Sequence, residues 1–348
     1  MHLNSFNHFR AISILLIIAG HSFEITGLKV NSLIDATAKN LIQGNTALFV
    51  FISGFLFHHI FYAKFKFQRF MSAKIKNVLV PYLILGFVPI CFFIASGKAD
   101  SNGYFLPTGE GVLFEYIIPA LKYYSSGYFL LAYWYIPFIM LVFLMSPLHI
   151  RFIHMSSKQQ FSLVFVFSTI SVLIHRPIDN VSVSVLHSLM YYTPVYLIGI
   201  MASINRIYIN NILSGKEVWL LVVVIGIAGY QALQGDVGNY HKAAMDYAAF
   251  DLMFFQKLVL CFFFMTFLNR FESYNNSYTH TVASTSFTAF FIHPFIIWVL
   301  GKIELSALNQ NSWLFYFFFV FAVTASCILI AKATKIIVPK YSRNLIGY

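Results

Sequence analysis

The amino-acid sequence predicts an all-α, polytopic integral membrane protein, and its composition and hydropathy pattern lead to that prediction. Of the 348 residues, 59% are hydrophobic and only 10% are charged. The mean hydropathy is +0.74, which the surface of a water-soluble globular protein of this size does not tolerate. Apolar windows of membrane-spanning length also recur along the chain. We therefore expect one integral membrane domain over residues 1–348.

About ten hydrophobic segments are separated by polar or turn-forming residues, which predicts about ten transmembrane helices. The predicted segments are residues 6–26, 41–62, 77–96, 128–148, 160–175, 186–204, 217–234, 250–268, 284–301 and 312–333. A cleaved signal peptide is the alternative for the first segment, but no clear small-residue cleavage site precedes His21, so we expect a retained helix. Residues 97–127, rich in Gly, Pro, Ser and Asn, are expected to form an irregular loop.

The positions of lysine and arginine predict how the helices are oriented. With the N-terminus inside, about fourteen of these residues fall on the cytoplasmic side and about seven on the other side. This asymmetry and the even number of segments predict that both termini are cytoplasmic. Topology explains the net charge of +11, so nucleic-acid binding is not expected. The three cysteines lie singly in apolar runs without ligand spacing, and no metal site is predicted.

The first segment carries ionisable residues on one helical face. Arg10 and His21 are eleven residues apart, about 20° past three full turns of an α-helix, so both point from one side. They lie roughly 16 Å apart along the helix axis. Such groups are costly in a membrane and tend to line bundle interiors or watery cavities, although Arg10 alone could be a snorkelling cation. Glu24, one turn beyond His21, either orients the imidazole or marks where the helix meets water.

Five stretches resemble motifs of a known family. The arginine and histidine separated by ten residues, RAISILLIIAGH, resemble the first-helix signature of the membrane-bound acyltransferase-3 family. Four further stretches are similar to its motifs and follow in its order: FVFISGFLF (49–57), KIKNVLVPYL (74–83), WYIP (134–137) and FFIHPF (290–295). The family often has His-Leu before the tryptophan, where this chain has Ala132 and Tyr133. The resemblance spans nearly the whole chain.

The resemblance implies an O-acyltransferase of the bacterial cytoplasmic (inner) membrane. Such an enzyme takes an acyl group, usually acetyl from cytoplasmic acetyl-CoA, to a hydroxyl of a glycan such as lipopolysaccharide, capsule or exopolysaccharide. Acetyl-CoA is then a substrate, and no bound cofactor is expected. His21 would deprotonate the acceptor hydroxyl or first accept the acyl group itself. Arg10, helped by Lys74 and Lys76, would hold the donor phosphates or stabilise developing charge.

Four more residues from these motifs are candidate substrate- or donor-binding positions: Ser53, Trp134, Tyr135 and His293. The Ser53-Gly54 pair is more typical of close helix packing than of a nucleophile. The two aromatic residues could stack on a sugar or the donor, or serve as interfacial aromatics. His293 precedes a proline, and proline-broken membrane helices often line cavities. The basic stretch 64–76 also suits anionic lipid, so membrane lipid is an expected partner.

Two other function classes fit the composition. A transporter or lipid-linked glycan flippase also needs many helices and intramembrane charges, but its site is expected at broken helices near the midplane. In this chain the charges lie toward opposite ends of one continuous predicted helix. A non-catalytic scaffold would have no requirement for His21. The composition does not distinguish lipid-facing from partner-facing surfaces, so it predicts no oligomeric state.

Overall fold

The computed structural model describes residues 3–97, 103–176, 178–239, 241–247, 249–274, 276–303 and 308–348. These residues form helices and no strand, and one isolated parallel bridge joins Ile178 to Lys242. The all-α prediction is therefore confirmed. Residues 98–102 of the predicted irregular loop lie outside the described residues.

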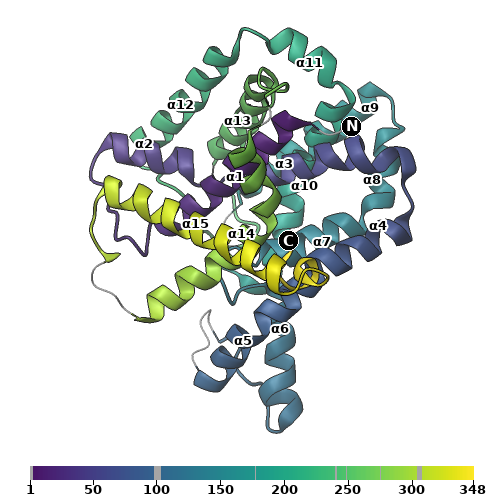
Figure 1. Cartoon of the computed structure of the whole chain (residues 1–348). Coiled ribbons are helices and arrows are strands. Elements are labelled where there is room, and N and C mark those ends of the chain that lie inside the picture. Colours follow the sequence, from purple (N-terminus) through teal and green to yellow (C-terminus); the bar gives the residue numbers. More distant parts are fainter. Residues whose placement is uncertain are drawn as a thin grey trace.

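The helices cross one another in a single bundle (Figure 1). In chain order they are α1 (Asn4–Ser22), α2 (Leu33–Ile42), α3 (Thr46–Leu56), α4 (Phe67–Lys74), α5 (Val80–Ser96), α6 (Ile118–Ser126), α7 (Tyr135–Leu144), α8 (Ser146–Ile153), α9 (Ser157–Ile174), α10 (Ser184–Ile204), α11 (Arg206–Leu213), α12 (Glu217–Leu233), α13 (Leu252–Asn269), α14 (Ser277–Ile303), α15 (Trp313–Ile337) and α16 (Ser342–Ile346). Five shorter helical turns adjoin them: η1 (Phe57–Phe61), η2 (Tyr62–Lys64), η3 (Ile75–Leu79), η4 (Leu113–Ile117) and η5 (Val181–Val183).

Many of these helices are long and apolar enough to cross a bilayer. Seven spans meet that description among the described residues, and up to nine if each of two bent helix pairs counts as one span. The bent pairs are α7 with α8, at 55°, and α11 with α12, at 85°. The chain is thus a multi-pass membrane protein. The count of ten spans and the cytoplasmic placement of both termini stay predictions.

The predicted segment 128–148 is wrong as one straight helix. Residues 128–134 form turns, and α7 begins only at Tyr135. A second helix, α8, begins at Ser146 after a bend. Pro147 lies in the first turn of α8 and has no N–H group, so it cannot continue the hydrogen-bond ladder of α7. This break places Trp134 at the entrance of α7 rather than inside a helix.

The predicted first segment, 6–26, corresponds to α1, which ends at Ser22. Turns follow, and Gly27 adopts a positive φ of 61° that suits glycine. The helix is not among the seven spans because of its polar side chains. It packs instead against α14, α15, α13 and α3, and Figure 1 shows it crossing the middle of the bundle. Neighbouring helices therefore shield its charged residues.

Polar contacts fix α1 near both ends. At its start, the Glu272 carboxylate accepts hydrogen bonds from the backbone N–H groups of Asn4 and Ser5, at 2.9 and 3.0 Å. A carboxylate here satisfies donors that the first turn leaves free and complements the helix dipole. Near its end, the Tyr316 hydroxyl of α15 donates to the carbonyl of Ala19 at 2.7 Å. Both contacts set where the Arg10 and His21 side chains lie.

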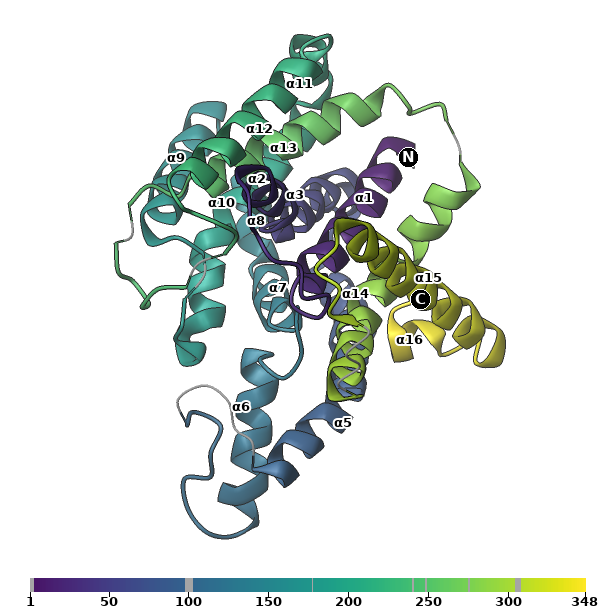
Figure 2. The same cartoon turned by 90° about the vertical axis from the view of Figure 1, so that its left-hand side faces the viewer.

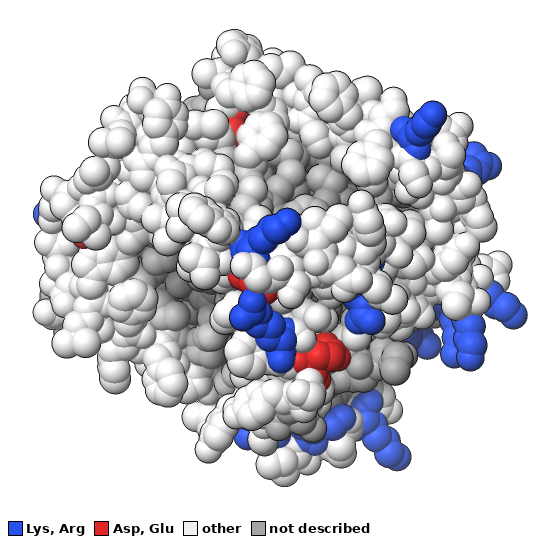
Figure 3. All heavy atoms as spheres, turned by 90° about the horizontal axis from the view of Figure 1, so that it is seen from above, with Lys and Arg blue, Asp and Glu red and all other residues white. Residues whose placement is uncertain are grey.

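The outer surface of the bundle fits a membrane environment. Figures 1 and 2 show α5 and α6 projecting together from one end. The face seen in Figure 3 is largely uncharged, with lysine and arginine gathered along one side and near its centre and few acidic residues. Large apolar side chains are also exposed on α5, α12 and α15, among them Phe87, Val218 and Phe321. Lipid contact accounts for such exposed apolar surface.

Two glycines allow α3 and α10 to pack closely. A Cβ atom added to Gly54 would overlap the carbonyl oxygen of Tyr196, and one added to Gly199 would overlap that of Phe51. Small residues let membrane helices approach in this way. The contact favours packing as the role of the Ser53-Gly54 stretch.

We predict that Gly54→Ala and Gly199→Ala each lower the stability of the protein by about 1–3 kcal/mol, because the methyl group forces the two helices apart. Thermal melting of the purified protein in detergent measures this loss. Gly226→Ala on α12 is the control, since an added Cβ there meets no atom within 4 Å. Equal melting temperatures for all three variants and the parent would contradict the proposed contact.

Candidate functional site

One helix, α14, contacts both polar residues of the α1 face. The Arg10 Nη2 atom donates to the Ser286 hydroxyl at 3.0 Å. His21 Nδ1 lies 3.0 Å from His293 Nε2. Residue numbers rise together along these two contacts, so α1 and α14 run in the same direction. The sequence prediction that the first and ninth segments share an orientation agrees with this arrangement.

The two histidines form a directed pair. The His293 Nδ1 atom lies 2.7 Å from the carbonyl oxygen of Ala289, which can only accept a hydrogen bond, so this nitrogen carries the proton. In the neutral ring, Nε2 then holds a lone pair and accepts from the Nδ1–H of His21. The rings stack nearly parallel, with centroids 5.3 Å apart and an interplanar angle of 7°. His21 is left with a lone pair on Nε2.

Burial differs between the two members of the pair. His293 is fully buried, whereas His21 is half-buried. Within the described part of the chain, no hydrogen bond is shown to His21 Nε2. Its lone pair is therefore not engaged by another described residue, while His293 fixes the tautomer and the ring orientation.

The partner of His21 is not the one that helical spacing suggested. Glu24 is exposed in the turn beyond α1, and no contact of its side chain with His21 is shown among the described residues. His293 occupies the position instead, 272 residues away in the chain. No periodicity links residues at that separation, and only the FFIHPF motif pointed to His293 at all.

Arg10 faces other cations rather than a carboxylate. It takes part in none of the three ion pairs found among the described residues. Helix α16, which carries Arg343, packs against η3, the turn directly after Lys74. Gly347, after α16, lies against Phe287, the neighbour of the Ser286 that binds Arg10. Unpaired cations that gather in this way favour an anionic ligand. Arg343 comes from the short C-terminal helix α16 and had no signal in the sequence beyond its charge.

Comparison with known proteins identifies the family. A family model described as an acyltransferase domain matches residues 3–332, nearly the whole chain. The chain belongs to the acyltransferase-3 family. No curated protein and no solved structure matches it. The protein is thus a membrane acyltransferase, and this assignment favours group transfer over the transporter, flippase and scaffold alternatives.

The basic residues of this acyltransferase differ in their surroundings. The Lys74 ammonium group lies over the rings of Phe61, Phe70 and Phe143, at 4.9, 5.1 and 4.4 Å from their centroids. Such cation–π contacts hold the charge in place without neutralising it. Lys76 is exposed. Lys74 is therefore the better placed of the two to act together with Arg10.

Among the described residues, the remaining candidates of this acyltransferase make no hydrogen bond to either histidine of the pair. Ser53 is half-buried on α3, beside the glycine contact with α10. Tyr135 is buried and packs against Phe290, at 5.3 Å between ring centroids, so it belongs to the core. Trp134 is half-buried at the entrance of α7. Among the described residues no cluster of three or more His, Cys, Asp or Glu side chains could hold a metal ion.

We predict that His293→Phe slows acyl transfer by about 10²–10³-fold, because the ring shape is kept but the acceptor for His21 Nδ1–H is lost. His293→Gln restores an accepting oxygen and should recover part of the rate. The acyl-transfer rates of the two purified variants, at equal melting temperature, test this positioning role. Equally slow variants would contradict it, since a role confined to packing gives no reason for rescue by an acceptor.

Proposed function

We propose that the protein transfers an acetyl group from cytoplasmic acetyl-CoA to a hydroxyl of a cell-surface or envelope glycan. The family assignment supports acyl transfer in a membrane. The observation that carries the proposal is the His293–His21 pair, which leaves a lone pair on Nε2 of the half-buried His21. A neutral imidazole nitrogen oriented by a second group is a suitable general base for a hydroxyl.

In direct transfer, His21 Nε2 removes the proton of the acceptor hydroxyl while the hydroxyl oxygen attacks the thioester carbonyl. The bond from that carbonyl to sulfur then breaks, and the imidazolium returns the proton to the departing thiolate. His293 stabilises the imidazolium because His21 Nδ1–H continues to donate to His293 Nε2.

The second route forms an acyl-histidine. Nε2 of His21 attacks the thioester carbonyl, the carbon–sulfur bond breaks and coenzyme A leaves as its thiolate. The acceptor hydroxyl then takes the acyl group from the nitrogen, and the hydroxyl proton passes to that thiolate. Both routes use the same nitrogen and the same tautomer. Rapid quenching followed by peptide mass spectrometry separates them, because only the second gives an acylated peptide that contains residue 21 without any acceptor present.

The cluster of Arg10, Lys74 and Arg343 suits the phosphate end of the donor. Coenzyme A carries phosphates at one end and the thioester at the other, joined by a long thin arm. Arg10 and His21 are eleven positions apart on the helix, which corresponds to roughly 16 Å. The three cations therefore bind phosphate at one end of α1, with Lys76 adding charge nearby, while the thioester extends toward His21.

The acceptor side completes the proposal. We place the protein in a bacterial cytoplasmic membrane, with the donor arriving from the cytoplasm and the glycan presented at the opposite face. Lipopolysaccharide, capsule and exopolysaccharide all offer suitable hydroxyl groups. Mass spectrometry of surface polysaccharide from cells with and without this gene would identify both the acyl group and its acceptor.

We predict that His21→Ala abolishes glycan O-acetylation in cells, because no other group in the site supplies a neutral lone pair at that position. Mass spectrometry of the surface glycan measures the outcome, with protein levels checked by immunoblot. His154→Ala, which removes an exposed histidine after α8, is the matched control. Unchanged acetylation in the His21 variant at a normal protein level would contradict the catalytic role of His21.

We predict that Arg10→Lys raises the KM for acetyl-CoA by about tenfold, since lysine keeps the charge but loses the planar guanidinium fork that binds phosphate bidentately. Steady-state kinetics of the purified protein provide the measurement. Arg151→Lys, an exposed arginine on α8, serves as the control. A donor KM and turnover equal to those of the parent would remove Arg10 from the donor site.

A further inference from the structure

Arg176 is a cation that neither the sequence motifs nor the proposed reaction has used. It follows α9 and is half-buried. Its guanidinium carbon lies 4.8 Å from the centroid of the Trp134 ring. None of the ion pairs found among the described residues includes it. An arginine that stacks on an indole keeps the N–H groups at its edge available to a ligand.

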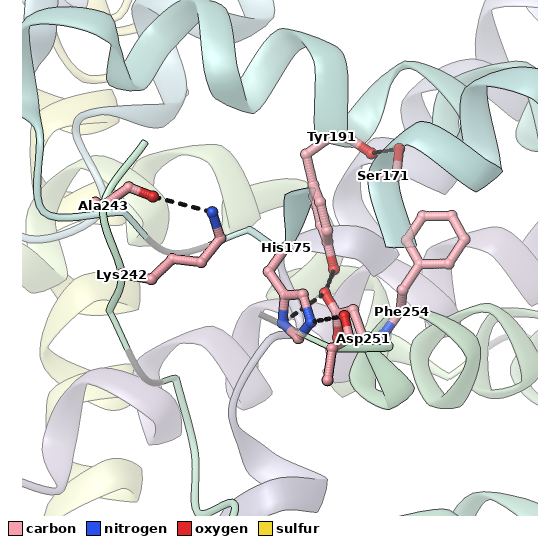
Figure 4. Close-up of polar contacts among 8 residues, drawn as sticks. Ser171, His175, Tyr191, Lys242, Ala243, Asp251 and Phe254 are labelled. Carbon is pink, nitrogen blue, oxygen red and sulfur yellow. Dashed lines mark hydrogen bonds and ion pairs between the residues drawn. The ribbon is translucent and has the colours of Figure 1, made fainter. Parts of the chain in front are cut away.

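A buried polar cluster holds the loop that carries Arg176 (Figure 4). His175, the residue before it, has a φ of +52°, a conformation that L-residues rarely adopt. Its Nε2 atom donates to the carbonyl of Ala249 at 2.8 Å, and its Nδ1 atom lies 3.9 Å from Asp251. Unusual backbone conformations persist where surrounding contacts impose them, often at functional sites. The direction of Arg176 is therefore imposed by the fold.

The nearby carboxylate of Asp251 has other partners. One of its oxygens accepts from the Tyr191 hydroxyl at 2.8 Å, and the other from the backbone N–H of Phe254 at 3.1 Å. Figure 4 shows the Tyr191 and His175 side chains pointing toward the Asp251 carboxylate. Asp251 therefore fixes the loop and does not neutralise Arg176.

Arg176 and Lys257 line one small cavity of about 10 Å³, whose lining includes no acidic residue. Lys257 is only 2% exposed, and its Nζ atom donates to the carbonyls of Asn40 and Leu41 at 2.9 and 3.0 Å, at the end of α2. Tyr192, also in the lining, is buried. With Arg176 and Lys257 in its lining and room for about one water-sized group, the cavity suits a single oxygen of an anionic group.

This cavity lies toward the His21 end of α1. Gly20, the residue before His21, packs against the end of α2, where an added Cβ would be 3.6 Å from the carbonyl oxygen of Ile42. The adjacent carbonyl of Leu41 is one of the two that Lys257 binds. An anion in the cavity would thus be close to the proposed general base.

We propose that Arg176, with Lys257 and Tyr192, binds a carboxylate or phosphate group of the acceptor, so that the enzyme selects an anionic glycan. This inference rests on the proposed function and names its substrate class. The cavity admits only a small charged group, so the sugar ring stays outside it with a hydroxyl directed to His21. Trp134 then acts as the platform that orients Arg176, in place of direct stacking on a sugar.

The test uses full-length protein in lipid nanodiscs, labelled acetyl-CoA and three forms of the host surface glycan. These are the native glycan, the same glycan after carboxyl reduction, and the same glycan after removal of phosphate. The parent should acetylate the native form about tenfold or more faster than the form that lacks the recognised anion. The treatment that lowers the rate, carboxyl reduction or phosphate removal, identifies which anionic group the enzyme recognises.

Arg176→Gln should remove this preference, because it should lower the acetylation rate of the native glycan to the rate of the treated glycan. Arg176→Lys should keep part of the preference. Lys302→Gln is the matched control, since Lys302 also lies over an aromatic ring, Phe92, at 5.5 Å, but does not line the cavity beside Arg176. A preference retained in Arg176→Gln, or equal losses on all three glycans, would overturn the inference. If the parent transferred acetyl to no glycan at all, the proposed function would be contradicted as well. This result therefore distinguishes a failure of the proposed function from a failure of the anion-binding inference alone.

Discussion

The structure depends on keeping one polar helix away from lipid. An arginine and a histidine cost free energy in hydrocarbon unless protein groups surround and bind them. Helix α14 supplies a hydroxyl for Arg10 and an imidazole for His21, and α15, α13 and α3 cover other sides of α1. The apolar helices outside can then face the bilayer. The residues that are costly in lipid therefore lie at the centre of the bundle. There they can act on substrates, and they do not interrupt the apolar outer surface.

This arrangement separates two chemical environments along one helix. Arg10 lies on the same side of the bundle as Lys74 of α4 and Arg343 of α16, and the histidine pair lies nearer the other end of α1. A donor with phosphates at one end and a thioester at the other matches that separation. The cavity between Arg176 and Lys257 adds a third environment, a small cationic one close to His21. Donor and acceptor can therefore reach one nitrogen from different sides.

Sequence reasoning succeeded where neighbours along the chain decide the outcome. The spacing of Arg10 and His21 predicted a shared helical face, and both contact α14. Sequence reasoning failed where contacts between residues far apart in the chain decide the outcome. The partner of His21 is His293, not the nearby Glu24, and the helix expected at 128–148 is interrupted before α7 and again at α8. The roles proposed for Arg10 and His21 in catalysis stay predictions until the variants are measured.

Composition, periodicity and motif order by themselves determined the class of protein: helical, multi-pass and a member of an acyltransferase family. These properties depend on local hydrophobicity and on residue spacing within single helices, which a chain carries without being folded. Only the tertiary structure decided which nitrogen of His21 is free and which cations share a cavity. Those outcomes depend on contacts between residues far apart in the chain, such as His21 with His293 or Arg176 with Lys257, and packing alone brings them together.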